Sequence, residues 1–306
     1  MIWLSGYFDF FILNLLCLVY EKILLLSTSN LWGDYRINLL CDVLGVSRSG
    51  YYDWLSRPMS PREQANQQLD EKIKVIYMRN KQRYGSPRIT RALQAESISC
   101  SHTRIERRMR SMGLKALAKR RFKITTDSGH NKPIFENILK RDFTTTAINQ
   151  KWVSDLTYIP TREGWLYLAV VIDVHSRSVI GSSMNKSMKQ DLVCDALLMA
   201  LFKRKYPKQV IIHSDRGSQY CSKKYREIIK QNKLIGSMSR KTNCWDNAIA
   251  ESFFHTLKTE LVHVNDYTTR AEARQSLFQY IEGYYNHRRM HSAIDYKTPV
   301  ALECAA

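Results

Sequence analysis

Three acidic residues lie where their types and positions could carry chemistry. Asp155 falls within a strand-like run, VSDLTYI, although aspartate is a poor strand residue, and its apolar neighbours predict burial on one side. Asp215 directly follows a second strand-like run, VIIHS, and ligands of open α/β sheets bind outside the carboxyl ends of the strands. Glu251 belongs to a helical stretch, NAIAESFFHTLKTEL. A turn, a cap or simple exposure would explain each residue alone, but together the three favour a shared site.

Glu251 is expected on the polar flank of its helix. At about 100° per residue, Glu251 and Lys258 fall together on one side of an apolar stripe. The stripe consists of Ala250, Phe254, Leu257 and Leu261, with Phe253 beside it. Such a flank borders the core and can face a cleft at the edge of a sheet. The helix therefore predicts a carboxylate and an ammonium group near the two strand aspartates.

Three carboxylates without a nucleophilic triad suit the cleavage or transfer of a phosphodiester. This reaction needs an activated nucleophile, a stabilised leaving oxygen and charge neutralisation at phosphorus, which two divalent cations about 3.5–4 Å apart supply together. Mg²⁺ prefers oxygen ligands and retains water, so a few carboxylates can hold it, with Mn²⁺ as a substitute. The sequence has no Gly-x-Ser-x-Gly, Walker, Cys-x-x-Cys or His-Glu-x-x-His motif. A metal is therefore expected on carboxylates.

The composition indicates a polyanionic partner and a reducing compartment. The 306 residues include 47 Lys and Arg against 28 Asp and Glu, a formal charge of +19. This surplus predicts binding to nucleic acid, with an anionic membrane surface as the alternative. Hydrophobic residues at 44% exclude wholesale disorder. The seven cysteines are scattered and odd in number, which argues against a disulfide scaffold and fits a reducing cytosol.

Residues 61–125 are predicted to form a basic helix–turn–helix region that binds DNA. Arg104, Arg107 and Arg108 have the i, i+3, i+4 spacing that puts three guanidinium groups on one helix face, where they could straddle phosphates. Residues 104–123 hold nine Lys or Arg and one Glu, whereas a merely solvated face is usually mixed in sign. The predicted DNA-binding residues here are Arg104, Arg107, Arg108, Arg120, Arg121 and Lys123. A small helical packing unit with a solvated face is the alternative.

Residues 147–303 have the pattern of a mixed α/β domain. Predicted strands cover 153–160, 165–174, 178–184, 209–213 and 234–239. Predicted helices cover 191–204, 224–231 and 247–262. Three early strands followed by alternating helices and strands indicate a mixed sheet with helices packed on it. Residues 126–146 have the Gly, Pro and Thr composition of a linker to the helix–turn–helix region.

Two further segments precede the helix–turn–helix region. Residues 33–60 predict a small helical segment, in which Gly45 ends one helix and Ser47 caps the next. Residues 1–32 form an apolar extension that is interrupted by Asp9, Asn14, Glu21 and Lys22. A spanning helix tolerates few such residues, so stable membrane insertion is not expected. A buried or partner-docking helix and an extension with no role in the fold are the alternatives.

The three carboxylates and the runs around them resemble the DDE core of retroviral-type integrases and transposases. Asp215 and Glu251 are separated by 35 residues. The sequence looks like the OrfB-type transposase of a large bacterial insertion-sequence family whose two reading frames are often fused by frameshifting. This resemblance rests on the runs QKWVSDLTYIP, YLAVVIDVHSR, HSDRGSQY, DNAIAESFFHTLKTE and YNHRRMHSAIDYKTP. It covers about residues 33–303 and keeps the order and spacing of several long motifs.

The resemblance implies an α/β, ribonuclease-H-like, mixed-sheet catalytic domain preceded by a helix–turn–helix region. It implies dependence on Mg²⁺ and strand transfer, in which a DNA 3′-OH attacks a phosphodiester. Asp155, Asp215 and Glu251 would be the metal-binding catalytic triad, and Lys258 would contact transposon-end DNA. The implied partners are the terminal repeats, target DNA, further copies of the chain on the DNA ends and the product of an upstream partner frame. A cytoplasmic, nucleoid-associated bacterial protein is expected.

Two alternatives to an active transposase stay open. Family members usually carry Gly where this sequence has Thr242, and a turn that needs a positive φ would be strained by Thr. Such strain would favour a catalytically impaired copy that acts only as a DNA-end-binding protein. A ribonuclease or junction nuclease would explain the carboxylates but not the long basic N-terminal half.

The C-terminal tail gathers aromatic and basic residues in the run YYNHRRMHSAI at 284–294. An exposed charge cluster is one interpretation of this run. The other is that the tail folds back beside the catalytic helix and widens a DNA-binding cleft.

Overall fold

The structure is a computed structural model that describes residues 41–42, 45–117, 133–240 and 244–305. The chain divides into two units, residues 1–64 and 65–306. The apolar extension and Thr242 lie outside the described residues. Within the described part of the chain, no helix is long and apolar enough to cross a membrane.

The first unit contains α3 (Arg48–Ser56). Ser47 caps this helix, since its hydroxyl accepts the N–H of Gly50 at 3.1 Å. Gly45 has a φ of +64°, in the left-handed region that favours glycine after a helix. Both predicted turn residues are therefore confirmed, although most of the first predicted helix lies outside the described residues.

Three helices of the second unit form the predicted helix–turn–helix region. They are α4 (Pro61–Arg79, which begins in the first unit), α5 (Ser86–Ala95) and α6 (His102–Ser111). They share one apolar core, whose fully buried members include Ile73, Ile89, Leu93 and Ile105. Ser101 caps α6, its hydroxyl accepting the N–H of Arg104 at 3.3 Å. The described part of the predicted region 61–125 thus contains three helices.

The rest of the second unit is built on a five-stranded mixed sheet in the order β3-β2-β1-β4-β5. The strands are β1 (Lys151–Ile159), β2 (Leu166–Asp173), β3 (Val179–Asn185), β4 (Ile211–Ser214) and β5 (Ile235–Met238). The first three pair antiparallel, whereas β4 pairs parallel with both β1 and β5. The predicted mixed sheet is confirmed.

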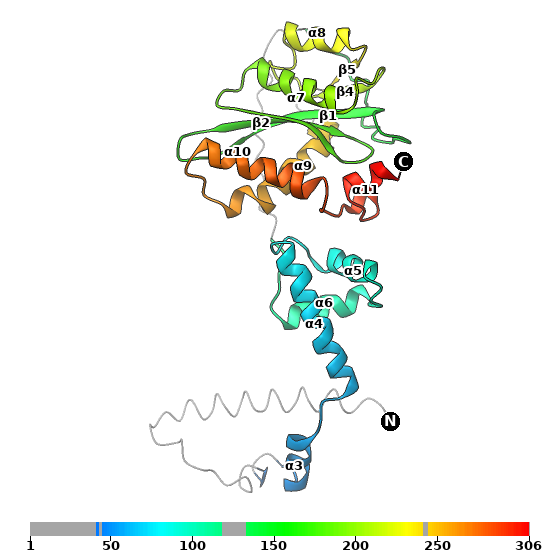
Figure 1. The fold of residues 1–306 in the computed structure, drawn as a ribbon, viewed down its shortest axis with the longest axis vertical. Helices are drawn as coiled ribbons and strands as arrows, with labels where there is room; N and C mark the ends of the chain where they lie inside the picture. The colour runs from blue at the N-terminus through cyan, green and yellow to red at the C-terminus, as the bar shows by residue number, and fades with distance from the viewer. Residues whose placement is uncertain (1–40, 43–44, 118–132, 241–243, 306) are drawn as a thin grey trace. The chain divides into compact units, whose positions relative to one another are not determined.

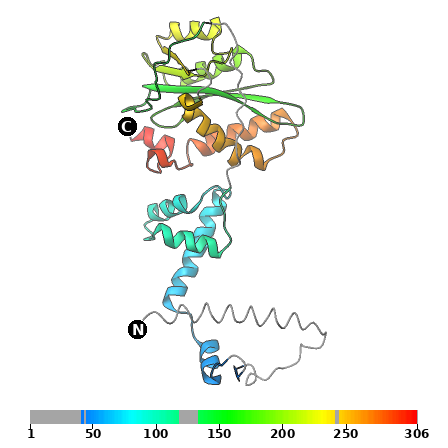
Figure 2. The same ribbon diagram turned by 180° about the vertical axis from the view of Figure 1, so that it is seen from behind.

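Helices cover both faces of the sheet (Figures 1 and 2). One face carries α7 (Gln190–Lys203) and α8 (Lys223–Gln231); the other carries α9 (Ala248–Glu260) and α10 (Arg270–Phe278). Because both faces are covered, β2 is almost continuously apolar and buried, as LYLAVVID predicts. The whole predicted apolar stripe of α9 is buried in the core on its side of the sheet.

The prediction of a linker at 126–146 is partly wrong, because its described part, residues 133–146, packs on the sheet. The ring of Phe135 lies against Gly236 of β5, where a Cβ would come within 2.7 Å of the ring. The hydroxyl of Ser237 accepts the N–H groups of Ile138 and Leu139 at 3.0 and 3.2 Å. Composition suggested a linker, but Leu139 is buried and Phe135 is partly buried in the cores on the two faces of the sheet, so residues 133–146 pack with the sheet.

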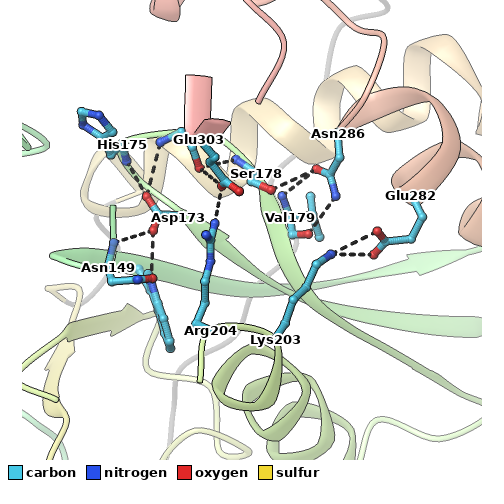
Figure 3. A network of polar contacts seen from close by, with 12 residues as sticks. Asn149, Asp173, His175, Ser178, Val179, Lys203, Arg204, Glu282, Asn286 and Glu303 are labelled. Carbon is cyan, nitrogen blue, oxygen red and sulfur yellow. Dashed lines mark hydrogen bonds and ion pairs between the residues drawn. The ribbon is translucent and has the colours of Figure 1, made fainter. Parts of the chain in front are cut away.

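The C-terminal segment is also tied to the sheet, as Figure 3 shows. The segment comprises η3 (Gln279–Tyr285, π-helical), the short η4 (Ser292–Ile294) and α11 (Pro299–Cys304). The Asn286 amide accepts the N–H of Val179 at 2.9 Å and donates to its carbonyl at 3.0 Å. Glu303 accepts from the Ser176 hydroxyl at 2.6 Å and pairs with Arg204. The C-terminal segment is therefore packed as part of the sheet domain.

Candidate active site

Strand register brings Asp155 and Asp215 side by side. In the last parallel pair of β1 and β4, Val153 lies opposite His213. Two residues further along, the same offset sets Asp155 at the level of Asp215, just past the end of β4. Side chains alternate along a strand, so Asp155 shares a face with Val153, which packs in the core beneath α9.

The two aspartates repel each other in a partly buried setting. The pKa of the Asp155 carboxyl is raised well above its ordinary value, first by burial and then by the negative charges of Asp215 and Glu251. The pKa of the buried Tyr220 hydroxyl is also raised, by burial and by the charges of both aspartates. A cation between the carboxylates would relieve this repulsion, since an opposite charge favours the ionised form.

Local backbone bonds orient both aspartates. One oxygen of Asp155 accepts the N–H of Leu156 at 2.8 Å, and one oxygen of Asp215 accepts the N–H of Gly217 at 2.9 Å. A Cβ on Gly217 would lie 2.9 Å from that Asp215 oxygen, so glycine leaves room for the bond. These bonds hold the carboxylates in place before any ligand arrives.

Glu251 lies in the first turn of α9, with its side chain exposed. Partial burial of its carboxyl raises the pKa of this group, and its charge reaches Asp155. Among the described residues, no three His, Cys, Asp or Glu side chains lie close enough to hold a metal as they stand. The donor chemistry nevertheless fits a hard divalent cation, because the two paired groups and Glu251 all offer carboxylate oxygens. An exposed glutamate can change rotamer to complete such a set.

Asp246 fixes the start of α9, a role that the sequence patterns did not reveal. Its carboxylate is fully buried and accepts from the side chains of Arg141 at 3.0 Å, Arg240 at 3.0 Å and Asn137 at 2.9 Å. The hydrogen bond from Arg240 is the largest of the effects that hold the pKa of Asp246 far below its usual range. The next residue, Asn247, donates to the carbonyl of Ser154 at 3.2 Å. The helix that carries Glu251 is therefore attached beside Asp155.

Lys258 lies two turns beyond Glu251 and is half-buried. Its Nζ is 5.1 Å from the centroid of the Tyr158 ring. Burial lowers the pKa of Lys258, while the negative charge of Asp155 opposes that shift. The ammonium group is thus near the aspartates rather than in the apolar core.

The basic residues of the helix–turn–helix region differ in their surroundings. Arg104 and Arg107 are exposed, and Arg104 donates to the Asn66 side chain at 2.9 Å. Arg108 is only half-exposed and makes a two-pronged ion pair with Asp70 of α4. The expectation that three guanidinium groups share one open face is therefore wrong for Arg108. Outside the described residues lie Arg120, Arg121 and Lys123.

The C-terminal run 284–294 folds back against α9, with Arg289 and His291 buried and His287 and Arg288 exposed. The ring of Tyr285 meets Phe253 edge-on at 4.8 Å. Arg289 donates to the Glu260 carboxylate at 2.9 Å, and both side chains are buried. The Tyr280 hydroxyl donates to the same carboxylate at 2.8 Å. The expected return of the tail to α9 is confirmed, and Arg289 is not part of an exposed charge cluster.

Glu260 also connects α9 to the helix–turn–helix region. Arg83 donates to the Glu260 carbonyl at 3.2 Å. The Tyr84 hydroxyl donates to the Arg288 carbonyl at 2.8 Å and accepts the N–H of Met290 at 3.1 Å. The helix that carries Glu251 at its start therefore contacts the helical region at its end.

Family models match most of the chain. An integrase core domain matches residues 145–244, a second integrase core model matches residues 233–299, and an HTH-like domain matches residues 63–122. Among solved structures, a simian T-cell lymphotropic virus intasome with the PP2A subunit B56 gamma is 16% identical with a TM-score of 0.45, covering 76% of this chain and 74% of that one. The HTLV-2 integrase catalytic core in complex with magnesium is 18% identical with a TM-score of 0.38, covering 51% and 96%.

Curated relatives are much more similar. The transposase InsF for insertion sequence IS3A of Escherichia coli K12 is 46% identical over 262 residues, which cover 85% of this chain and 91% of the relative. An uncharacterized 31 kDa protein of the insertion element IS600 from Shigella sonnei is 43% identical over 263 residues, covering 86% and 97%. With an integrase core, an HTH-like domain and this identity, the chain belongs to the IS3 family of transposases, which are DDE polynucleotidyl transferases.

Proposed function

We propose that Asp155, Asp215 and Glu251 are the metal-binding catalytic residues with which this transposase cleaves and joins element ends. The observation that carries the proposal is the register of β1 and β4, which sets two carboxylates side by side under mutual repulsion. Mg²⁺ is the proposed cation, with Mn²⁺ as a substitute, since both accept carboxylate oxygens. Divalent cations at such a site activate the attacking oxygen and neutralise charge at phosphorus.

The protein residues have separate tasks in this proposal. Asp155 and Asp215 would hold the cation, and Asp155, whose raised pKa favours the protonated form, would release its proton as the cation binds. Glu251 would complete the ligand set, since its exposed side chain is free to change rotamer. Lys258 neutralises a phosphate of the element end beside the aspartates, because its ammonium group lies within reach of the Asp155 charge.

The experiment that tests the proposal is a strand-transfer assay with a labelled element end and target DNA. Joined product is expected with Mg²⁺ and not with a chelator. Retained end binding without any joining would support the second candidate, a catalytically impaired DNA-end-binding protein. The departure at Thr242 is the observation that favours this candidate. Loss of both binding and joining in a folded protein would contradict both.

Arg107, an exposed arginine of α6, is expected to bind the DNA backbone. Arg107→Ala should weaken end binding and lower the slope of log K against log salt by about 0.9, because one phosphate is then no longer neutralised. Titrations between low and physiological salt, followed by fluorescence anisotropy, measure this slope. Arg274→Ala, which removes an exposed arginine of α10, is the control and should leave the slope unchanged. If the slope for Arg107→Ala equals that of the wild-type protein, Arg107 belongs to a solvated face only.

Partners and location follow from the same proposal. The DNA partners are the terminal repeats and target DNA, and bridging two ends calls for more than one copy of the chain. The product of an upstream frame is a further proposed partner. Such a reaction takes place on chromosomal DNA, so we place the chain in the bacterial cytoplasm at the nucleoid.

A further inference from the structure

The hairpin between β1 and β2 holds a tryptophan at the surface. Trp165 is 48% exposed, although burial of so large a ring would be favourable. The backbone around it is held firmly from α10. Arg270 donates to the carbonyl of Trp165 at 3.0 Å and to the carbonyl of Glu163 at 2.6 Å. The backbone N–H of Arg270 donates to the Glu163 carboxylate at 2.8 Å. The exposed ring therefore stands on an ordered support.

Trp165 is part of a small aromatic and cationic group. Its ring meets the Tyr158 ring edge-on, with centroids 4.8 Å apart. The Lys258 ammonium lies 5.1 Å from the centroid of the same Tyr158 ring. The two aromatic side chains and the ammonium group thus form one continuous group, which we call the aromatic platform.

The aromatic platform lies beside the catalytic carboxylates. Tyr158 follows Asp155 by three residues on β1, so alternation turns the two side chains to opposite faces of the strand. Lys258 links them, because its ammonium lies against the Tyr158 ring and interacts with the charge of Asp155. Beyond Ser214, where β4 ends, no strand among the described residues pairs with β1 on that side, so this part of β1 forms an open sheet edge. A substrate end held at Asp155 and Asp215 would therefore pass close to the platform.

An exposed indole beside an ammonium group suits a nucleotide. A base stacks on the aromatic ring, and the ammonium group pairs with a phosphate. Inside a duplex, neighbouring bases cover both faces of each base, so any base except the outer face of a terminal pair must leave the stack before it can stack on a protein ring. We propose that Trp165, supported by Tyr158, stacks on an unpaired base at the element end and thereby holds the end frayed at the active site. This inference rests on the proposed function.

The test uses element ends that carry 2-aminopurine, whose fluorescence is quenched by stacking, at one of the three terminal base pairs. With wild-type protein, fluorescence at one position should change on binding, and Trp165→Ala should abolish that change. The same measurement in the Asp155→Asn background needs no chemistry, so it can be read whether or not the carboxylates prove catalytic. Tyr206→Ala removes a side chain of matched exposure, 46%, far along the chain after α7, and should leave the signal intact.

Strand transfer supplies a second readout that a merely structural role would not give. On fully paired ends, Trp165→Ala and the bulkier Trp165→Leu should both lower joining about tenfold. On ends with mismatched terminal pairs, joining by both variants should recover to within about twofold of wild type. The terminal bases of these ends are already unpaired, so Trp165 is no longer needed to hold them apart. Unchanged fluorescence in Trp165→Ala, or an equal defect on paired and mismatched ends, would overturn the proposal. A melting curve shows whether Trp165→Ala is folded. If it is not, the same comparison of paired and mismatched ends is made with Trp165→Leu.

Discussion

Asp155→Asn should lower strand transfer by a factor of about 1,000 or more, while end binding changes less than about twofold. A factor of 1,000 corresponds to about 4 kcal/mol of lost transition-state stabilisation. The physical reason is that asparagine keeps the size of the side chain but removes the charge that, in the proposed site, would hold a cation beside Asp215. Single-turnover joining of a labelled end in Mg²⁺ gives the rate, and anisotropy gives the affinity.

A surface aspartate of the same domain is the matched control. Asp191→Asn removes an exposed carboxylate in the first turn of α7 that pairs with Lys224. Exposed ion pairs contribute little, so joining should stay close to wild type. If Asp155→Asn joins ends as well as Asp191→Asn does, Asp155 is not part of the reacting site.

Glu260→Gln should lower the free energy of unfolding by about 3–5 kcal/mol, because it leaves the buried Arg289 charge without its partner. Four hydrogen bonds end on this carboxylate, three from Arg289 and one from Tyr280. Urea denaturation followed by circular dichroism measures the loss. The same change should reduce joining, since α9 carries Glu251 at its other end.

Glu227→Gln provides the comparison for this prediction. Glu227 is exposed on α8 and lies 3.9 Å from Lys223, four residues earlier. Pairs of this kind on helix surfaces contribute about 0.3–0.5 kcal/mol. A similar small loss for Glu260→Gln would mean that the buried pair does not hold α9 in place.

Local patterns were sufficient for the elements that carry the candidate site. Apolar runs located every strand to within about two residues, because strands buried on both faces are recognisable without knowledge of their partners. The apolar stripe of α9 gave its buried face, and thus the flank shared by Glu251 and Lys258. The family resemblance, rather than periodicity, gave the roles of the carboxylates.

Contacts between residues distant in sequence were not predictable in this way. Arg108 looked like a solvent-exposed cation because its partner Asp70 lies 38 residues earlier. Asp246 looked ordinary because Arg141 lies 105 residues away. A charged side chain can be buried only where the fold brings an oppositely charged partner next to it. The spacing of residues in the sequence does not show whether this happens. The same reason explains the tail, where Arg289 is neutralised by Glu260, 29 residues earlier.

Direct measurement of cation binding tests the central claim, that Asp155 and Asp215 hold a divalent metal. Free Mn²⁺ can be followed by its electron paramagnetic resonance signal as the full chain, with an element end bound, is titrated. Wild type should bind Mn²⁺, and binding should weaken as the pH falls, because protons compete for Asp155, whose pKa is raised. Asp155→Asn and Asp215→Asn should each lower the affinity at least about tenfold, and Asp191→Asn should not. Equal Mn²⁺ binding by wild type and both active-site variants would contradict the account.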